Sequence, residues 1–196
     1  MYYLSHGNMA MKDILIWSLP AKTTCPMSTP LCRKFCYALK AERCWANSLS
    51  CRKENLESTM EKQYVENMVT VIKAELLRSK KPITHFRIHE SGDFYTQQYL
   101  DAWKAICSYF HKLKFLAFTK SFHLDFDIRP KNLQFVMSVW EDSNFDKIPK
   151  GFPISFTGLK GWNAIKCSGG EDKCNHCGFK CWDLSKLGKN VWSLIH

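Results

Sequence analysis

In the first half of the chain, short apolar runs typical of strands alternate with stretches in which apolar residues recur at helical spacing. The apolar run at residues 13–18 predicts a short strand, and residues 53–79 repeat apolar side chains at helical spacing, which predicts a long helix. The same patterns predict a second strand at residues 83–89 and a second helix at residues 96–112. Strands that alternate with helices are typical of parallel βα units.

The second half of the chain carries three more strand-like runs, at residues 114–121, 132–140 and 152–158, with little room between them for full helices. A complete eight-stranded barrel usually takes about 250 residues, and this chain has 196. We therefore predict an α/β fold that forms a partial or trimmed TIM-like barrel, with an open α/β sheet as the alternative. We expect one domain over residues 1–196, with a βα core at residues 83–160.

Polar side chains gather at the end of the second predicted strand. Side chains alternate across a strand, so His85, Arg87 and His89 should share one face. Ligands of α/β folds lie at the carboxyl ends of strands, which makes Arg87, His89 and Asp93 candidate catalytic residues. The alternative is structural: Arg87 pairs with an acid such as Glu90, and the histidines bond to backbone groups.

Cysteines change this picture more than any other residue type. The chain has 10, and seven of them form two sets: Cys25, Cys32 and Cys36 in a predicted loop at residues 18–52, and Cys167, Cys174, Cys177 and Cys181 within residues 161–183. The start of the chain has no secretory signal, so we expect a cytoplasmic, reducing environment. Closely spaced cysteines in that environment indicate metal binding or catalysis rather than disulfides.

Thiolates are soft ligands that select zinc or iron–sulfur clusters. Structural zinc usually uses four ligands and Cys-x-x-Cys knuckles, which the first set lacks. The second set has one knuckle, and its spacings of 6, 2 and 3 resemble iron–sulfur ligation more closely. We predict one or two [4Fe–4S] clusters, with zinc as the alternative. Cys44 and Cys51 keep the ligand count of the first set open, whereas Cys107 is predicted to be a core residue.

The first set, which we call the triad, resembles a loop of radical S-adenosylmethionine (SAM) enzymes. There, three cysteines follow the first barrel strand and leave one iron open, although the spacing Cys-x6-Cys-x3-Cys found here differs from theirs. The run from Glu90 to Asp93 is similar to the small and acidic motif that holds the amino group of SAM in those enzymes. The resemblance implies SAM as a cofactor, and the cofactor-binding candidates are Glu90, Ser91, Gly92, Lys120 and Ser121.

A closer resemblance covers most of the chain, in order, from about Ser18 to Asp183. Short motifs in the cysteine-rich stretch are followed by RIHESGDFY, FTKS and a terminal CxxCxxxCW, and this ordered set resembles the phage gene product 88 domain family. The resemblance implies a phage or prophage origin, the host cytoplasm as the location, and a cysteine-rich domain that binds iron–sulfur clusters. It supplies no reaction.

Charge adds a weaker indication about partners. The formal net charge is +10, and two clusters on seven thiolates would lower it to about +7. A basic protein favours phosphate-bearing partners, so we expect a nucleotide or nucleic-acid substrate, with a host reductant and no membrane. Two functions stay open: an iron–sulfur enzyme of the radical-SAM type, or a non-catalytic metal-stabilised protein that binds nucleic acid or a host protein.

Overall fold

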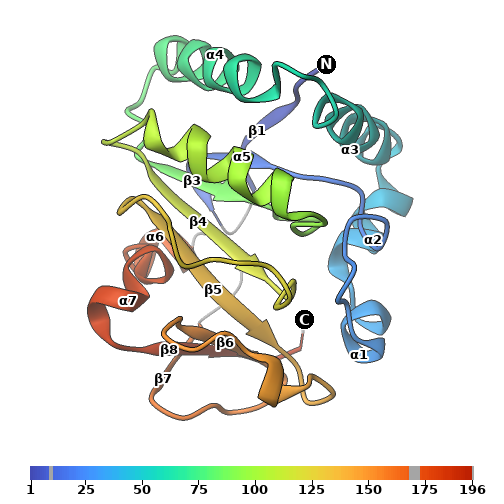
Figure 1. Cartoon of the computed structure of the whole chain (residues 1–196), viewed down its shortest axis with the longest axis vertical. Helices are drawn as coiled ribbons and strands as arrows, with labels where there is room; N and C mark the ends of the chain where they lie inside the picture. Colours follow the sequence, from blue (N-terminus) through green and yellow to red (C-terminus); the bar gives the residue numbers. More distant parts are fainter. Residues whose placement is uncertain (9–10, 168–172, 196) are drawn as a thin grey trace.

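The computed structural model describes residues 1–8, 11–167 and 173–195, and a single large sheet lies at its centre (Figure 1). Within these residues the sheet has eight strands in the order β1-β2-β3-β4-β5-β6-β8-β7. β1 is antiparallel to β2, and the other pairs are parallel. The strands are β1 (Leu4–Gly7), β2 (Lys12–Trp17), β3 (His85–Ile88), β4 (Lys114–Thr119), β5 (Leu133–Val139), β6 (Ile154–Thr157), β7 (Ala164–Lys166) and β8 (Asn190–Ser193).

The predicted α/β class is confirmed, but the sheet is open rather than closed into a barrel. β1 and β7 form its two edges in the described part of the chain. The predicted strands correspond to β2 through β6, and their parallel register keeps neighbouring strand ends together. Trp17 at the end of β2 pairs with Ile88 at the end of β3, and Ile88 pairs with Ala117 on β4.

Helices fill most of the connections that parallel strands require. Two of the longer ones, α4 (Tyr64–Arg78) and α5 (Gln97–Ser108), pack on the sheet. The others are α1 (Pro30–Lys34), α2 (Tyr37–Cys44), α3 (Ala46–Ser58), α6 (Lys173–His176), α7 (Leu184–Leu187), and the 3₁₀ helices η1 (Phe145–Lys147) and η2 (Lys180–Asp183). None of the described helices is long and apolar enough to cross a membrane.

The prediction of one helix at residues 53–79 is wrong, because α3 and α4 are separate. The hydroxyl of Ser58 donates to the carbonyl of Asn55 at 2.7 Å, and that of Thr59 donates to the carbonyl of Leu56 at 2.6 Å. Hydroxyls that bond to helix carbonyls in this way compete with the continuing backbone ladder. The apolar spacing continues across the break, which is why periodicity alone misses it.

The prediction that residues 18–52 are a loop is also too simple, since α1, α2 and the first part of α3 lie there. The Thr29 side chain accepts the backbone N–H of Cys32 at 3.2 Å, and Pro30 is the first residue of α1. A threonine cap followed by proline is a standard start of a helix.

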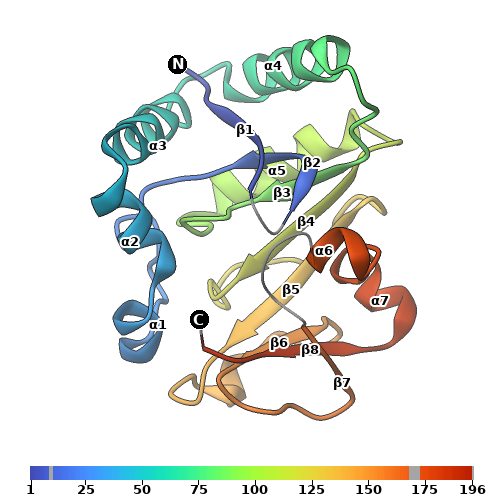
Figure 2. The ribbon, with the colours of Figure 1, turned by 180° about the vertical axis from the view of Figure 1, so that it is seen from behind.

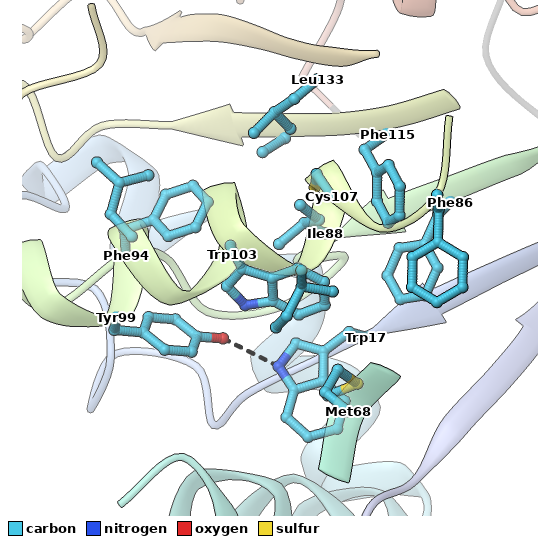
Figure 3. Close-up of a cluster of buried hydrophobic side chains, with 14 of the residues drawn as sticks. Trp17, Met68, Phe86, Ile88, Phe94, Tyr99, Trp103, Cys107, Phe115 and Leu133 are labelled. Carbon is cyan, nitrogen blue, oxygen red and sulfur yellow. Dashed lines mark hydrogen bonds between the residues drawn. The ribbon is translucent and has the colours of Figure 1, made fainter. Parts of the chain in front are cut away.

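A large apolar core lies between the sheet and helices α4 and α5. Trp17, Phe86 and Phe115 project from three adjacent strands into this core, where they meet Met68 of α4 and Trp103 of α5 (Figure 3). The indole N–H of Trp17 donates to the hydroxyl of Tyr99 at 2.9 Å, whereas the indole N–H of Trp103 has no hydrogen-bond partner among the described residues.

The opposite face of the sheet is covered by the C-terminal segment. Ile16, Leu116 and Val136 pack there with Trp182 and Leu184, and α6 and α7 lie in front of the strands in Figure 2. Both faces of the central strands are therefore buried, which explains why β4 and β5 are apolar almost throughout.

Candidate metal sites at the carboxyl ends of the strands

The triad lies in the connection that follows β2, the first strand with a parallel partner. This connection is tied to the next strand end, because the Leu19 N–H donates to the carbonyl of Ser91 at 2.9 Å. Its α1 portion reaches across to the end of β5. There the Leu31 N–H donates to the carboxylate of Asp142 at 2.8 Å, and the rings of Phe35 and Trp140 stack with centroids 6.2 Å apart.

The three thiols of the triad lie close enough to influence one another electrostatically. Burial raises the pKa of Cys25 to about 12, and the charges of Asp93, Cys32 and Cys36 add to this increase. Burial also raises the pKa of Cys32, while the ammonium group of Lys120 opposes the increase. Without a metal these two thiols therefore hold their protons at neutral pH, and metal binding must release protons.

The three cysteines of the triad are soft donors, but they are not grouped closely around a single position. Among the described residues, no three His, Cys, Asp or Glu side chains are grouped so as to hold one metal ion. In an iron–sulfur cluster each thiolate binds a different iron, so the sulfur atoms stand farther apart than they do around zinc. All three thiols of the triad are half-buried in the structure.

Hydrogen bonds to Asp93 connect the loop after β3 to the end of β4. The buried carboxylate of Asp93 accepts the hydroxyl of Thr119 at 2.6 Å and the backbone N–H groups of Lys120 and Phe94, each at 2.7 Å. Burial raises the pKa of Asp93, although these three hydrogen bonds oppose the increase. The hydroxyl of Ser121 donates to the carbonyl of Phe94, which adds a further link between the same two loops.

Lys120 connects the predicted cofactor residues to the triad. Its ammonium group donates to the hydroxyl of Ser138 at 2.9 Å and lowers the pKa of Cys32. Sequence reasoning missed Ser138, although a serine within the apolar run LQFVMSV was a usable signal. It also missed Tyr37, whose hydroxyl donates to the carbonyl of Glu90.

The turn formed by Ser91 and Gly92 packs directly against the triad connection. Gly92 has a φ of +87°, and a Cβ added there would lie 2.6 Å from the Thr24 hydroxyl and 2.7 Å from the Leu19 side chain. The hydroxyl of Ser91 is buried and has no hydrogen-bond partner among the described residues. An unpaired buried hydroxyl is costly in an apo protein and indicates a place for a ligand or water.

Arg87 and His89 lie on different sides of the sheet, which corrects the predicted shared face. His89 has a φ of +62°, and this turns its ring into the aromatic core against Phe94 and Tyr99. Its Nε2 lies 2.9 Å from the hydroxyl of Tyr99, and burial lowers its pKa to about 3. His89 is therefore a neutral core histidine in the structure.

Arg87 lies on the face of the sheet that the C-terminal segment covers. Its guanidinium group lies 4.0 Å from the centre of the Phe118 ring, and its Nε donates to the carbonyl of His89 at 3.2 Å. The ion pair with Glu90, which the structural alternative predicted, is absent among the described residues. Burial lowers the pKa of Arg87, and the Glu90 charge opposes this decrease. The Glu90 carboxylate instead accepts an N–H of the Asn8 side chain at 2.6 Å.

Arg87 faces the second cysteine set, which we call the quartet: Cys167, Cys174, Cys177 and Cys181. Burial raises the pKa of Cys174 to about 11 and that of Cys181 to about 12, and the charge of Cys167 adds to both increases. Arg87 lowers both values. Cys174 and Cys181 of the quartet thus lie near the half-buried side chain of Arg87, and residues 168–172 lie outside the described part of the chain.

The remaining cysteines stand apart from these two sets. Cys44 is exposed at the end of α2, and Cys107 is buried in α5 within the large core, as predicted. Cys51 is half-buried on α3.

These features define an open α/β-sheet protein with cysteine-bearing segments at both ends of its fold. The chain belongs to the gene product 88 family, whose model matches residues 4–156. A relative, the Gene 88 protein of Mycobacterium phage D29, is 29% identical over 102 residues, which are 50% of this chain and 42% of that protein. The chain thus matches less than half the length of this relative. No solved structure matches the chain.

The family match is shorter than the resemblance expected from the sequence, which extended to Asp183. It includes the triad, Arg87, Asp93 and Lys120, but the quartet begins beyond residue 156. The names of the family and of the phage relative state no metal and no reaction.

Proposed function

We propose that this protein is an iron–sulfur enzyme whose triad holds a [4Fe–4S] cluster with one open iron position. The observation that carries the proposal is the position of Cys25, Cys32 and Cys36. They follow the first parallel strand, lie near one another at the carboxyl edge of the sheet, and have Asp93 and Lys120 beside them. A structural metal does not require such polar neighbours, whereas a reaction site does.

A cluster of this kind, when bound, would supply an iron position for SAM and an electron for its cleavage. The chain's own residues would supply binding and orientation. The unpaired hydroxyl of Ser91 and the ammonium group of Lys120 suit the polar end of such a cofactor. Asp93 would be a positioning residue, because its carboxylate is already occupied by three donors.

Among the residues predicted to be catalytic, Arg87 is the best candidate for substrate contact. Its terminal N–H groups make no hydrogen bond to the described residues, and its charge acts on Cys174 and Cys181 of the quartet. His89 is buried and neutral, so its role here is to shape the turn that carries Ser91 and Asp93. The quartet would hold a second, auxiliary cluster.

The test is a metal analysis of protein purified without oxygen. We expect iron and sulfide at about four or eight per chain, and a reduced EPR spectrum that changes when SAM is added. Cys32→Ala should lose one cluster and the response to SAM. Cys44→Ala is the matched control, since Cys44 is exposed at the end of α2, and it should keep full iron content.

Three outcomes would count against this proposal. Full iron content in Cys32→Ala would remove the triad from the ligand set. A cluster whose spectrum ignores SAM would mean that the open position takes something else or is closed by another ligand. Zinc without sulfide would make both sets structural and would favour the non-catalytic alternative.

A further inference from the structure

A strip of basic and aromatic side chains covers the outside of the triad segment. α1 and α2 stand along one side of the molecule, next to the ends of β4 and β5 (Figures 1 and 2). We call their outer surface the α1–α2 strip, and its exposed members are Arg33, Lys34, Phe35, Tyr37, Lys40, Arg43 and Trp45.

The positive charge of this strip is not neutralised within the described structure. Residues 22–53 contain the basic residues Lys22, Arg33, Lys34, Lys40, Arg43, Arg52 and Lys53 but a single acid, Glu42. Glu42 is already paired with Arg52 at 2.9 Å, and both side chains are buried. In the described part of the chain, no carboxylate forms an ion pair with the four basic side chains of the strip.

The aromatic side chains of the strip are exposed, and two of them, Phe35 and Tyr37, are held in place by contacts. Trp45 is 67% exposed and Tyr37 is 54% exposed, which is unusual for such large rings. Tyr37 is fixed by the hydrogen bond from its hydroxyl to Glu90, and Phe35 is fixed by its stack on Trp140. A ring that is already ordered loses little conformational entropy when a flat ligand stacks on it.

We propose that the α1–α2 strip binds single-stranded nucleic acid. Unpaired lysine and arginine side chains attract phosphates, and exposed rings stack on bases, which a duplex hides but a single strand offers. An acidic protein partner would satisfy the charges but would leave the rings without matching flat faces. The proposal stands on the surface alone and holds whichever metal the triad takes.

Two properties of this binding follow from the composition of the strip. The phosphate contacts make binding salt-dependent, and each one contributes a slope of about 0.7 in the logarithm of affinity against the logarithm of salt concentration. Loss of one stacking ring should weaken binding about tenfold or more. Binding should also tolerate changes of base sequence, because every base has a flat face.

The experiment is a titration of full-length, metal-loaded protein into fluorescent single-stranded DNA and RNA, and into the matching duplexes, between about 50 and 200 mM salt. Trp45→Ala should weaken single-strand binding about tenfold, and Trp45→Phe should restore most of it. Lys40→Gln combined with Arg43→Gln should reduce the salt slope by about 1.4. Iron content and thermal denaturation are measured for each variant, so that loss of the cluster or of the fold is recognised.

Matched controls come from exposed aromatic and basic residues outside the strip. Tyr109, which is 60% exposed at the end of α5, is the control ring, and Lys62 with Lys73 forms the control pair of charges. Tyr109→Ala and the double variant Lys62→Gln, Lys73→Gln should bind as the wild type does.

Several results would overturn the proposal. They are absent binding at low salt, equal binding of duplex with no effect of Trp45→Ala, equal loss in the control variants, or equal binding of polyglutamate. Normal iron content in a protein that binds no nucleic acid would reject this inference and leave the iron–sulfur proposal intact. Binding of single-stranded nucleic acid by a protein that lacks iron would support this inference and reject the iron–sulfur proposal.

Discussion

The triad and the quartet have similar thiols but different surroundings. Triad residues lie beside a carboxylate and a lysine, in a segment that is tied to β3 and reaches the end of β5. Cys174 and Cys181 of the quartet lie near the half-buried side chain of Arg87, in a segment that begins beyond the family match. The difference shows how one sheet can present two thiol environments, one close to an acid and a cation together and one close to a cation.

This comparison bears on what each set can do. A nearby acid opposes the negative charge of a thiolate-bound cluster, whereas a nearby cation stabilises it. The triad also has polar groups to contact a ligand, among them the unpaired hydroxyl of Ser91. Under the proposed function, ligand binding belongs to the triad, and the quartet has a supporting or electron-transfer role.

The largest expected effect comes from removal of one ligand from each set. Cys32→Ala and Cys177→Ala should each lose about half of the iron and sulfide if both sets hold clusters. Only Cys32→Ala should abolish the effect of SAM on the reduced EPR spectrum. If Cys177→Ala abolishes it instead, the two assignments must be exchanged.

The next effect tests whether packing against β3 holds the triad in place. Gly92→Ala puts a Cβ against Thr24 and Leu19 at a φ of +87°, so we expect a loss of stability on the order of 3 kcal/mol and a loss of triad iron. Gly151→Ala is the matched control, because Gly151 has a φ of +82° with open space around it. That variant should lose only about 1 kcal/mol and no iron. Urea unfolding and iron analysis measure both, and equal losses in the two variants would show that backbone strain, not contact, is responsible.

The smallest expected effect tests whether His89 is a neutral core residue, unlike Arg87, which lies near it at the end of β3. The pKa of His89 is about 3 in the folded chain, below the ordinary value of 6.5, so the unfolded state binds the proton first as the pH falls. Stability is therefore present above about pH 6.5 and is lost as the pH falls toward 3. Between pH 6.5 and 5 this loss amounts to about 2 kcal/mol.

His89→Asn should remove this part of the acid response, since asparagine tolerates a positive φ and does not titrate. Urea unfolding at pH 7 and pH 5 measures the free energy of unfolding of the wild type and of the variant. All other titrating groups are the same in the two proteins. An unchanged difference between the two pH values would mean that His89 is accessible to protons and belongs to the polar site after all.

The strands were predictable where an apolar run was long and bounded by polar residues, as in β4 and β5. β1 and β8 were missed because LSHG and NVWS are short and form strands only through pairing with distant residues. The helix α1 was missed because its cysteines and prolines suggested a loop, although Thr29 and Pro30 carry the start signal.

The candidate site was predictable in its residue types and only partly in its geometry. Sequence spacing placed the triad after a strand and put Asp93 at the next strand end, as the structure has them. It could not predict the positive φ of His89, which depends on burial of the ring beside Tyr99 rather than on alternation along a strand. It also could not predict that Arg87 would face the quartet, because that contact joins residues about ninety positions apart.

The reach of α1 from β2 to β5 has a mechanical consequence. An open sheet lacks the closing ladder that fixes the curvature of a barrel, and two strands lie between β2 and β5 in this one. The Leu31–Asp142 hydrogen bond and the Phe35–Trp140 stack connect the segment after β2 to the residues after β5, at the carboxyl edge of the sheet. The triad segment thus connects the two strand ends and opposes their separation. A force that pulls β2 away from β5 would strain these two contacts before it breaks the hydrogen bonds between the strands.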